Sequence, residues 1–455
     1  MSYKRFEFDK DYVAYIWPDH PLVLAGTIIL DDVVKGIESG LEKEKISRKI
    51  SSKYNINYEE VEDYVYNIVN SIEIAKSTQK KAVDLLNIEV SMATFNITSL
   101  CNMRCKHCYA SVGDKLIVNE LTEKDIEVII KKLSKFVKHS PRLLILSGGE
   151  PTLCLNKLIY AINTAYKYGF NVRLNTNGMI ITDALIDTLK SCNVLTQISI
   201  DGATAKSHAL LRGSEDSYYA AIKTVDRLIK SGCRVRISMT THKDNYKEIP
   251  KAFENAIECG AEQFITSNLV LTGEAKKNGL LPIELKEEFE ILYNFVKNDK
   301  QLQLMTKSTL LAETINAIRA GVKFINCGTG ICTCCVDSDG SIYPCINMVN
   351  EEYRITNLLN EKSLDEIWNE SPIINKIKDL SVDNINLQCP KCVFRYFCGA
   401  YCRGETMSAG GSINDPYIRC IEWKQALIYV LRILCETPDL YYFNRNSELE
   451  MMERE

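Results

Sequence analysis

The chain has 455 residues, of which 46% are hydrophobic and 25% are charged, values close to those of average globular proteins. This length suggests about three domains and excludes a small scaffold that depends on disulfide bonds. Lys and Arg total 55 against 59 Asp and Glu, so the net charge of −4 lacks the basic footprint of a protein that binds nucleic acid.

The N-terminus and the most apolar late segment argue against export and membrane insertion. Charged residues occupy the first positions, where a signal peptide would carry an apolar stretch. The segment Ala426 to Cys435 is far shorter than the roughly 20 residues that span a bilayer. We therefore expect a cytoplasmic protein without a membrane partner, in which the 18 cysteines are free of disulfides.

Residues 1–85 predict a small domain in which strands precede helices. Aromatic and β-branched runs at Tyr12–Trp17 and Leu22–Leu24, separated by a turn with two prolines, predict two strands. Helices are expected at 31–40 and 46–54, and a third has its apolar face at Val61 and the residues that follow at helical spacing. A strand pair with three helices predicts a winged-helix-like unit.

Residues 90–310 predict an α/β domain, because six short β-rich runs alternate with longer amphipathic stretches. The runs are Ala93–Thr98, Leu143–Ser147, Val172–Thr176, Gln197–Asp201, Arg234–Thr240 and Gln263–Val270. Strands that alternate with helices form parallel sheets with right-handed crossovers, and six of them suit a partial (β/α)6 TIM barrel. Ligands of such folds bind at the carboxyl ends of the strands.

A cluster of three cysteines, Cys101, Cys105 and Cys108, follows the first of these strands. Three thiolates on one loop can hold three irons of a four-iron cubane and leave the fourth iron open for chemistry. The alternative is a zinc knuckle with His107 as a fourth ligand, although His107 and its neighbour Cys108 would then have to point the same way.

The second strand ends in Gly148, Gly149 and Glu150. Two glycines allow close approach of the backbone to a ligand, and the carboxylate of Glu150 suits an amino group. Alone, this triplet could equally form an ordinary tight turn, so its weight comes from its place one strand after the cysteine loop.

Residues 320–435 are rich in cysteine and weak in periodicity, as expected where metal coordination replaces an apolar core. A charged tail, 436–455, follows. The cysteines with regular spacing are Cys327, Cys345, Cys389, Cys392, Cys398, Cys402 and Cys420. Taken alone, they could also form two zinc ribbons.

The cysteine loop, the Gly-Gly-Glu-Pro turn, Asn175-Thr176-Asn177-Gly178 and Ser199-Ile200-Asp201-Gly202 together resemble radical SAM enzymes over about residues 90–300. The resemblance implies that Cys101, Cys105 and Cys108 bind a 4Fe-4S cluster whose open iron chelates S-adenosyl-L-methionine. It further implies the remaining contacts of this cofactor: Gly148, Gly149 and Glu150 at the methionyl amino group, Ser199 and Arg212 at the ribose or carboxylate, Tyr109 near the adenine, and Asn175 and Asn177.

The later cysteines resemble the SPASM extension of radical SAM maturases, which holds up to two auxiliary 4Fe-4S clusters. The resemblance implies a distal cluster on Cys389, Cys392, Cys398 and Cys420, and a proximal cluster on Cys327, Cys345 and Cys402. Cys332 is the preferred fourth proximal ligand, and an open iron that binds a substrate thiolate is the alternative. Cys334 and Cys335 are expected to be packing residues. We expect five further cysteines to be buried in the core: Cys154, Cys192, Cys233, Cys259 and Cys435.

The pattern of residues 1–85 resembles the winged-helix leader-recognition element of peptide-modifying radical SAM enzymes. An extended leader peptide would pair with an exposed strand edge beside a helix. The alternatives are a DNA-binding winged helix or a packing domain, and the acidic helices do not favour phosphate binding. Among the histidines, none is assigned to catalysis, and His208 is expected to make a structural hydrogen bond.

These features predict a maturase that uses the 5'-deoxyadenosyl radical on a ribosomal precursor peptide, with cysteine thioether formation as the preferred outcome. Its partners would be the precursor peptide with its leader and an external one-electron reductant of the flavodoxin or ferredoxin type. Carbon–carbon or carbon–oxygen cross-linking, epimerisation, and formylglycine or haem-type chemistry on another substrate are the alternatives. The non-enzymatic alternative is an iron-sulfur or zinc regulatory protein.

Overall fold

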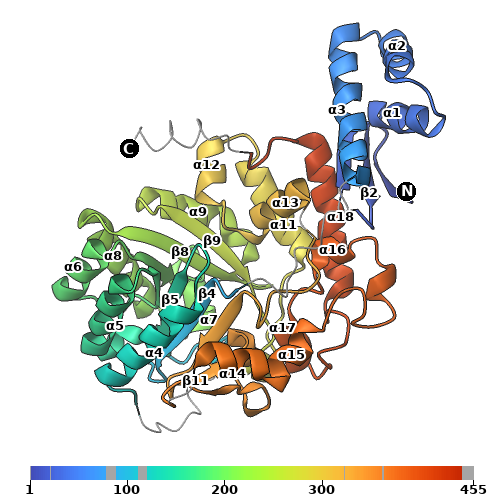
Figure 1. The fold of residues 1–455 in the computed structure, drawn as a ribbon. Helices are drawn as coiled ribbons and strands as arrows, with labels where there is room; N and C mark the ends of the chain where they lie inside the picture. The colour runs from blue at the N-terminus through green and yellow to red at the C-terminus, as the bar shows by residue number, and fades with distance from the viewer. Residues whose placement is uncertain are drawn as a thin grey trace.

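The computed structural model describes residues 2–20, 22–77, 89–110, 120–321, 323–360 and 363–442. An N-terminal domain stands beside a larger body in which helices surround a central sheet (Figure 1). None of the described helices combines the length and the hydropathy that crossing a membrane requires.

The N-terminal domain consists of a three-stranded antiparallel sheet in the order β1-β2-β3, followed by three helices. Its elements are β1 (Lys4–Phe8), β2 (Tyr12–Trp17), β3 (Leu22–Thr27), α1 (Ile29–Glu38), α2 (Lys43–Tyr54) and α3 (Tyr58–Ser77). The sequence predicted two strands, so β1 is an addition. This strand was not predicted, because its charged residues are partly exposed and interrupt any apolar run. The domain has its own core, and the predicted apolar face of α3 belongs to it.

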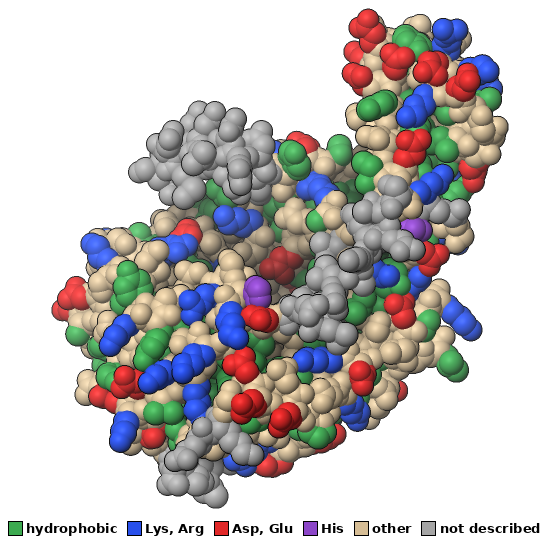
Figure 2. Space-filling model, viewed as in Figure 1, with side chains coloured by type: hydrophobic (Ala, Val, Ile, Leu, Met, Phe, Trp, Pro, Cys, Tyr) green, Lys and Arg blue, Asp and Glu red, His purple; other side chains and the backbone are tan. Residues whose placement is uncertain are grey.

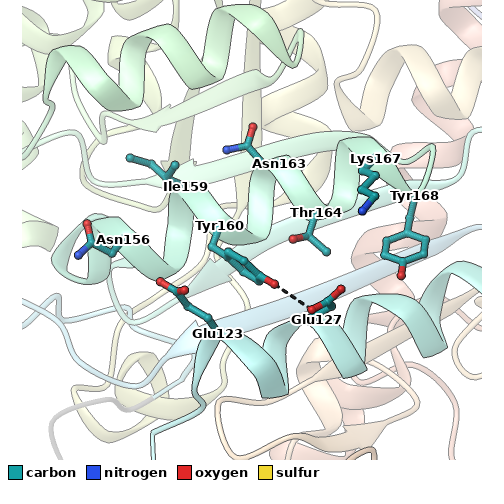
Figure 3. Close-up of a pocket in the computed structure, with 9 residues that line it drawn as sticks. All are labelled: Glu123, Glu127, Asn156, Ile159, Tyr160, Asn163, Thr164, Lys167 and Tyr168. Carbon is teal, nitrogen blue, oxygen red and sulfur yellow. Dashed lines mark hydrogen bonds between the residues drawn. The ribbon is translucent and has the colours of Figure 1, made fainter.

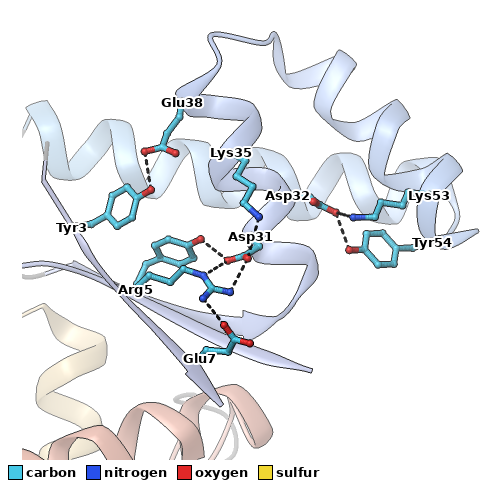
Figure 4. A network of polar contacts seen from close by, with 10 residues as sticks. Tyr3, Arg5, Glu7, Asp31, Asp32, Lys35, Glu38, Lys53 and Tyr54 are labelled. Carbon is cyan, nitrogen blue, oxygen red and sulfur yellow. Dashed lines mark hydrogen bonds and ion pairs between the residues drawn. The ribbon is translucent and has the colours of Figure 1, made fainter. Parts of the chain in front are cut away.

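A buried carboxylate ties the sheet of this domain to its first helix (Figure 4). Arg5 of β1 donates two hydrogen bonds of 2.8 Å to Asp31 of α1, and the hydroxyl of Tyr15 donates a third of 2.5 Å. Burial alone would raise the pKa of Asp31, but these donors lower it to about 2. Asp31 is therefore a charged anchor between two elements rather than a ligand for an external partner.

The larger body contains a nine-stranded sheet in the order β12-β11-β10-β4-β5-β6-β7-β8-β9. The six expected parallel strands are confirmed as β4 (Met92–Thr98), β5 (Leu143–Gly148), β6 (Asn171–Thr176), β7 (Leu195–Ser199), β8 (Arg234–Thr241) and β9 (Gln263–Asn268). The helices around them are α4 (Glu123–Phe136), α5 (Leu155–Lys167), α6 (Asp183–Ser191), α7 (Ala205–Arg212), α8 (Asp216–Lys230) and α9 (Ile249–Glu258). The fold is therefore the predicted α/β partial barrel.

Side chains alternate along the barrel strands between two environments. In β4, Ala93, Phe95 and Ile97 belong to the main apolar core, whereas Asn96 and Thr98 are buried polar residues on the other face. This alternation places polar groups inside the barrel, immediately before the strand ends where the predicted site residues begin.

The C-terminal part adds three strands to the barrel sheet. They are β10 (Thr333–Val336), β11 (Ser341–Tyr343) and β12 (Thr356–Asn357), and β10 runs parallel to β4. The remaining helices are α10 (Gly273–Lys277), α11 (Leu285–Val296), α12 (Lys300–Met305), α13 (Leu310–Ala320), α14 (Leu364–Glu370), α15 (Pro372–Lys378), α16 (Arg395–Cys398), α17 (Arg403–Ser408) and α18 (Cys420–Glu436). Short 3-10 turns lie at Pro151–Cys154, Tyr246–Glu248, Ile346–Met348, Glu351–Tyr353 and Cys389–Lys391.

Most cysteines expected to be packing residues are buried. Cys334 and Cys335 of β10 are buried in the sheet, and Cys192, Cys233 and Cys435 are also buried. The prediction was wrong for two others, because Cys154 and Cys259 are only half-buried. Both lie at helix ends, where one side of the residue stays open to solvent.

The N-terminal domain packs against α18, as Figure 1 shows on its right side. The thiol of Cys435 lies 3.3 Å from the carbonyl oxygen of Val13 in β2, and Arg432 forms an ion pair of 3.1 Å with Asp9. A second contact joins the turn before β3 to α16, where Asp19 and Arg395 are 2.5 Å apart.

Candidate active site and iron-sulfur sites

The three cysteines of the first cluster lie together on the loop after β4. Burial is the largest cause that raises the pKa of Cys105 to about 11, and the neighbouring Cys101 and Cys108 contribute in the same direction, as expected for three thiols on one short loop. The loop is fastened to α7, because the amide of Lys106 donates a hydrogen bond of 2.8 Å to the carbonyl of Leu211. The structure therefore brings together the three thiols that the spacing predicted.

His107 does not join these thiols. Its Nε2 atom lies 3.4 Å from a carboxylate oxygen of Asp201, and burial lowers its pKa to about 4, so the imidazole is neutral near pH 7. Its Nδ1 atom is buried without a hydrogen-bond partner among the described residues, but in this part of the chain His107 and the cysteines form no group arranged to hold a single metal ion, so a zinc knuckle is not favoured.

The two glycines after β5 serve a close approach of the chain to itself. Gly148 has a φ of 140°, which disfavours any other residue, and a Cβ atom there would lie 2.3 Å from the carbonyl oxygen of Thr98. A Cβ atom on Gly149 would lie 2.1 Å from the carbonyl oxygen of Leu100. The sequence reading placed a ligand against these glycines, but the atoms nearest to them belong to the start of the cysteine loop.

Glu150 is buried, and four donors hold its carboxylate. Oε1 accepts hydrogen bonds from the amide and hydroxyl of Thr152 and from the hydroxyl of Thr176, whereas Oε2 accepts one from the amide of Asn177 at 2.7 Å. Each carboxylate oxygen offers about two lone-pair sites. The three donors on Oε1 share the sites of that oxygen, whereas Oε2 has a single donor. Oε2 therefore retains capacity for one further donor, such as an ammonium group.

Asp201 is a site residue that the sequence reading did not single out. It has no exposed surface, its Oδ2 accepts a hydrogen bond of 2.6 Å from Nε of Arg212, and its Oδ1 accepts one of 2.7 Å from the amide of Thr240. Burial would raise the pKa of Asp201, but the charge of Arg212 and the other contacts lower it to about 2. A signal was available in the motif from Ser199 to Gly202, in which Asp201 stands eleven residues before Arg212.

Arg212 in turn connects this carboxylate to the cysteine loop. Its Nη1 atom lies 3.9 Å from the sulfur of Cys105, while Nε is committed to Asp201. The guanidinium thus provides positive charge beside a thiol that would carry iron. His208 packs on the same network through Nδ1, which accepts a hydrogen bond from the amide of Asp201, so its predicted structural role is confirmed.

Three further residues that were predicted to bind the cofactor differ in how they are engaged within the protein. Asn177 is engaged within the protein, because its Nδ2 donates to Asn102 at 2.8 Å and its Oδ1 accepts from the amide of Met179. Oδ1 of Asn175 is buried without a hydrogen-bond partner among the described residues. Ser199 is half-buried opposite Ser238.

Tyr109 follows the cysteine loop directly and is 37% exposed as a residue, although its hydroxyl lies in buried surroundings near β5 and β10. Burial raises the pKa of its hydroxyl, which is also affected by the nearby thiol of Cys335 and by a hydrogen bond with Ser147. These neighbours lie on β10 and β5, so its position near an adenine remains a prediction.

A second set of thiols, the proximal set, consists of Cys327, Cys332, Cys345 and Cys402. Burial, with a contribution from negative charge on Cys327 and Cys345, raises the pKa of Cys402 to about 12. The same two cysteines act on Cys332, whose thiol also donates to the carbonyl of Gly328 at 3.4 Å. Cys332 therefore lies with the three proximal cysteines, as its spacing predicted.

A third set, the distal set, consists of Cys389, Cys392, Cys398 and Cys420. All four line one small cavity together with Phe394 and Trp423. Burial, with a contribution from negative charge on the other three, raises the pKa of Cys398 to about 12. Four convergent thiols under an apolar cover match the donor set that iron-sulfur clusters require.

The described residues contain no group of three or more His, Cys, Asp or Glu side chains arranged to chelate a single metal ion. A larger cavity of about 510 Å³ lies between α4 and α5 on the outside of the barrel (Figure 3). It contains none of the predicted site residues, so the candidate chemistry stays at the strand ends.

Two family models match the chain. The radical SAM superfamily matches residues 95–256, and the iron-sulfur cluster-binding domain SPASM matches residues 327–393. These ranges contain the cysteine loop and most of the later cysteines.

The chain aligns with most of the length of individual relatives. The AdoMet-dependent heme synthase of Methanosarcina barkeri is 26% identical over 349 residues, which cover 72% of this chain and 96% of that protein. The mycofactocin maturase MftC of Mycolicibacterium smegmatis is 24% identical over 333 residues, which cover 72% of this chain and 82% of that protein.

Among solved structures, Streptococcus suis SuiB bound to its precursor peptide SuiA matches 91% of this chain and all of that chain, with a TM-score of 0.58 and 15% identity. This likeness shows a common fold. Together with the two family models and the thiol sets, it identifies the chain as a radical SAM enzyme with a C-terminal SPASM domain.

Proposed function

We propose that this enzyme modifies a ribosomally made precursor peptide and that its product carries cysteine thioether cross-links. The observation that carries the proposal is the N-terminal domain, which has its own core and packs on the SPASM side of the molecule. β1 and β3 each have an outer edge that pairs with no described strand, and an extended leader could add to either edge. The peptide maturase MftC and the peptide-bound SuiB structure support this assignment.

The alternative of a DNA-binding domain is not favoured. The first turn of α3 carries Glu59 and Glu60, and in Figure 2 acidic side chains lie among basic ones over the N-terminal domain. The acidic start of α3 repels phosphates.

The residues of the barrel mouth suit the cofactor pair that the superfamily uses. Cys101, Cys105 and Cys108 would hold a 4Fe-4S cluster, and the free lone pair on Oε2 of Glu150 would accept the ammonium of S-adenosylmethionine. When bound, these groups supply a 5'-deoxyadenosyl radical that removes a hydrogen atom from a carbon of the substrate. Asp201 keeps Arg212 oriented beside the cluster loop, and the buried surroundings exclude water from the radical.

A thioether outcome would use the proximal set, in which Cys332 is the thiol that a substrate cysteine could replace. Forming one cross-link removes two hydrogens from the peptide. One leaves as a hydrogen atom that converts the 5'-deoxyadenosyl radical into 5'-deoxyadenosine, and the other leaves as a thiol proton together with one electron. If Cys332 did not serve as a ligand, one iron of the proximal cluster could bind the substrate thiolate. The distal set, with four protein thiols, would be complete without the substrate.

The test uses anaerobically reconstituted enzyme, S-adenosylmethionine and dithionite. We expect 5'-deoxyadenosine from the wild type and none from Cys105→Ala, because that variant loses a ligand of the open cluster. With a precursor peptide encoded beside the gene, we expect the loss of two hydrogens and of one alkylatable thiol per cross-link.

Cys392→Ala separates the two cluster sites. It should still release 5'-deoxyadenosine but give no cross-linked peptide, and its iron content should fall. An unchanged yield of modified peptide would limit the distal site to a structural role. Zinc in place of iron in the wild type would contradict the enzymatic proposal.

A second candidate is radical chemistry on a haem precursor, which is favoured by the similarity to the heme synthase over 96% of that protein. Turnover of an iron porphyrin without any peptide, at a rate that truncation of residues 1–85 leaves unchanged, would support it. We retain the division into 1–85, 90–310, 320–435 and 436–455 as a proposal for such truncations.

A further inference from the structure

The surface beside the distal thiols carries an unusual concentration of exposed apolar side chains. Leu387 is 89% exposed and Ile421 is 75% exposed, the two highest values for large hydrophobic side chains in the described part of the chain. Ile418, three residues before Ile421, is 53% exposed.

These side chains form one patch because the distal site joins their segments. The side-chain amide of Gln388, next to Leu387, donates to the sulfur of Cys420 at 3.8 Å, and Ile421 follows Cys420 at the start of α18. Full burial of a Leu or Ile side chain is worth about 1.5–3 kcal/mol, so three exposed ones represent a free energy that a partner can recover.

The patch has basic neighbours in a chain whose net charge is −4. Lys391 is exposed between Cys389 and Cys392, and Lys424 lines the distal cavity close to Cys420. Glu422, which directly follows Ile421 in the sequence, is already paired with Arg419 at 2.6 Å. An apolar centre with a basic rim favours an acidic protein as its partner.

We propose that Leu387, Ile418, Ile421, Lys391 and Lys424 form the docking surface for a small acidic protein that carries one electron at a time on a flavin or an iron-sulfur centre. The proposal rests on the proposed function, which needs one electron to start the reaction and releases one when the cross-link forms. Each encounter moves a single electron between the carrier and the iron-sulfur group that the distal thiols would hold, and no covalent bond is made or broken. The place fits, because none of the four distal thiols is fully buried and the patch lies beside them, so a docked carrier would come close to their iron-sulfur group.

The experiment measures binding of an acidic flavodoxin and of an acidic ferredoxin to the reconstituted enzyme by calorimetry. We expect binding that weakens with added salt. The double variant Leu387→Asp and Ile421→Asp should bind at least about tenfold more weakly, and Lys391→Glu should reduce the salt dependence. Iron content of each variant confirms that the distal site is loaded.

Two matched controls carry the same chemical changes elsewhere. Leu281→Asp alters a side chain that is 58% exposed before α11, and Lys223→Glu reverses an exposed charge on α8. Both should bind the carriers like the wild type. Product formation with dithionite needs no carrier, so its failure would count against the proposed function and not against docking.

Three outcomes would overturn the docking proposal. The first is that neither carrier binds the wild type, and the second is that the patch variants bind as well as the controls. The third is a dimer in sedimentation experiments that Leu387→Asp dissociates, because the patch would then be covered by a second copy of the chain.

Discussion

At the scale of single residues, the carboxylate of Asp201 is the most constrained charge near the cysteine loop. It holds Arg212 beside Cys105, it has no exposed surface, and its pKa of about 2 lies below the usual 3.8. A depressed pKa means that the charged form stabilises the fold at pH values above about 4, and that this contribution is lost as the pH falls toward 2.

We predict that Asp201→Asn lowers the stability of the barrel by about 3 kcal/mol at pH 7, because the buried Arg212 loses its counter-charge. The difference from wild type should narrow below pH 4. Thermal unfolding followed across this pH range measures it. Asp183→Asn is the matched control, since Asp183 pairs with Arg227 at an exposed site and should cost little. Equal effects of the two substitutions would contradict the role given to Asp201.

The residue scale also shows the limit of motif reading. Spacing predicted the three thiols of the cysteine loop, and the resemblance to the SPASM extension implied the proximal and distal sets, whose members the structure brings together from distant parts of the chain. Asp201 belonged to a motif that the sequence showed, but its role was not assigned because its tertiary partners on α7 and β8 are not part of that motif.

At the scale of elements, the end of β5 is pressed against the start of the cysteine loop. The amides of Gly149 and Glu150 donate to the carbonyls of Thr98 and Leu100 at 2.8 Å and 2.7 Å. This approach positions the carboxylate of Glu150 beside the loop that would hold the open cluster.

Gly149→Ala should therefore push the two segments apart, since its Cβ would lie 2.1 Å from a backbone oxygen. We predict that S-adenosylmethionine binds at least about tenfold more weakly, a loss of roughly 1.4 kcal/mol, while the three thiols still load iron. Equilibrium dialysis and iron analysis test the two parts. Gly40→Ala is the control, because it makes the same substitution at a glycine that has no atom within 4 Å of the added Cβ, although its φ of 69° is less favourable for alanine. It should cost only about 1 kcal/mol of stability in its own domain.

Elements with strong apolar periodicity were predictable, and short ones were not. The six parallel strands of the barrel follow from runs of buried residues between helical patterns. β10 was missed because its four residues include Cys334 and Cys335, which were considered as possible ligands or packing residues and not as a strand beside β4. The winged-helix prediction for residues 1–85 is not confirmed by the comparisons, although its helices are present.

At the scale of the whole molecule, the N-terminal domain touches both segments that carry the distal thiols. Asp19 pairs with Arg395, and Phe6 packs on Phe394 with ring centroids 5.6 Å apart, within the segment between Cys392 and Cys398. The sheet of the domain also packs on α18, which begins at Cys420.

We predict that Asp19→Asn makes the distal cluster more labile, because the clamp on Arg395 is lost. Iron release to a chelator should be faster by up to about fivefold, the range of a partly exposed ion pair. Asp9→Asn removes another ion pair of the same interface, with Arg432, twelve residues after Cys420. It should leave iron release unchanged, and a similar acceleration in both variants would argue against local coupling.

Because α18 is one continuous helix, it fixes the rotational position of the N-terminal domain relative to Cys420 and the distal thiols. One residue inserted between Cys420 and Cys435 would turn everything beyond it by about 100°, so the sheet of the N-terminal domain would meet a different stripe of the helix. Lineages of this enzyme should accordingly tolerate length changes in this helix only in steps that restore its register.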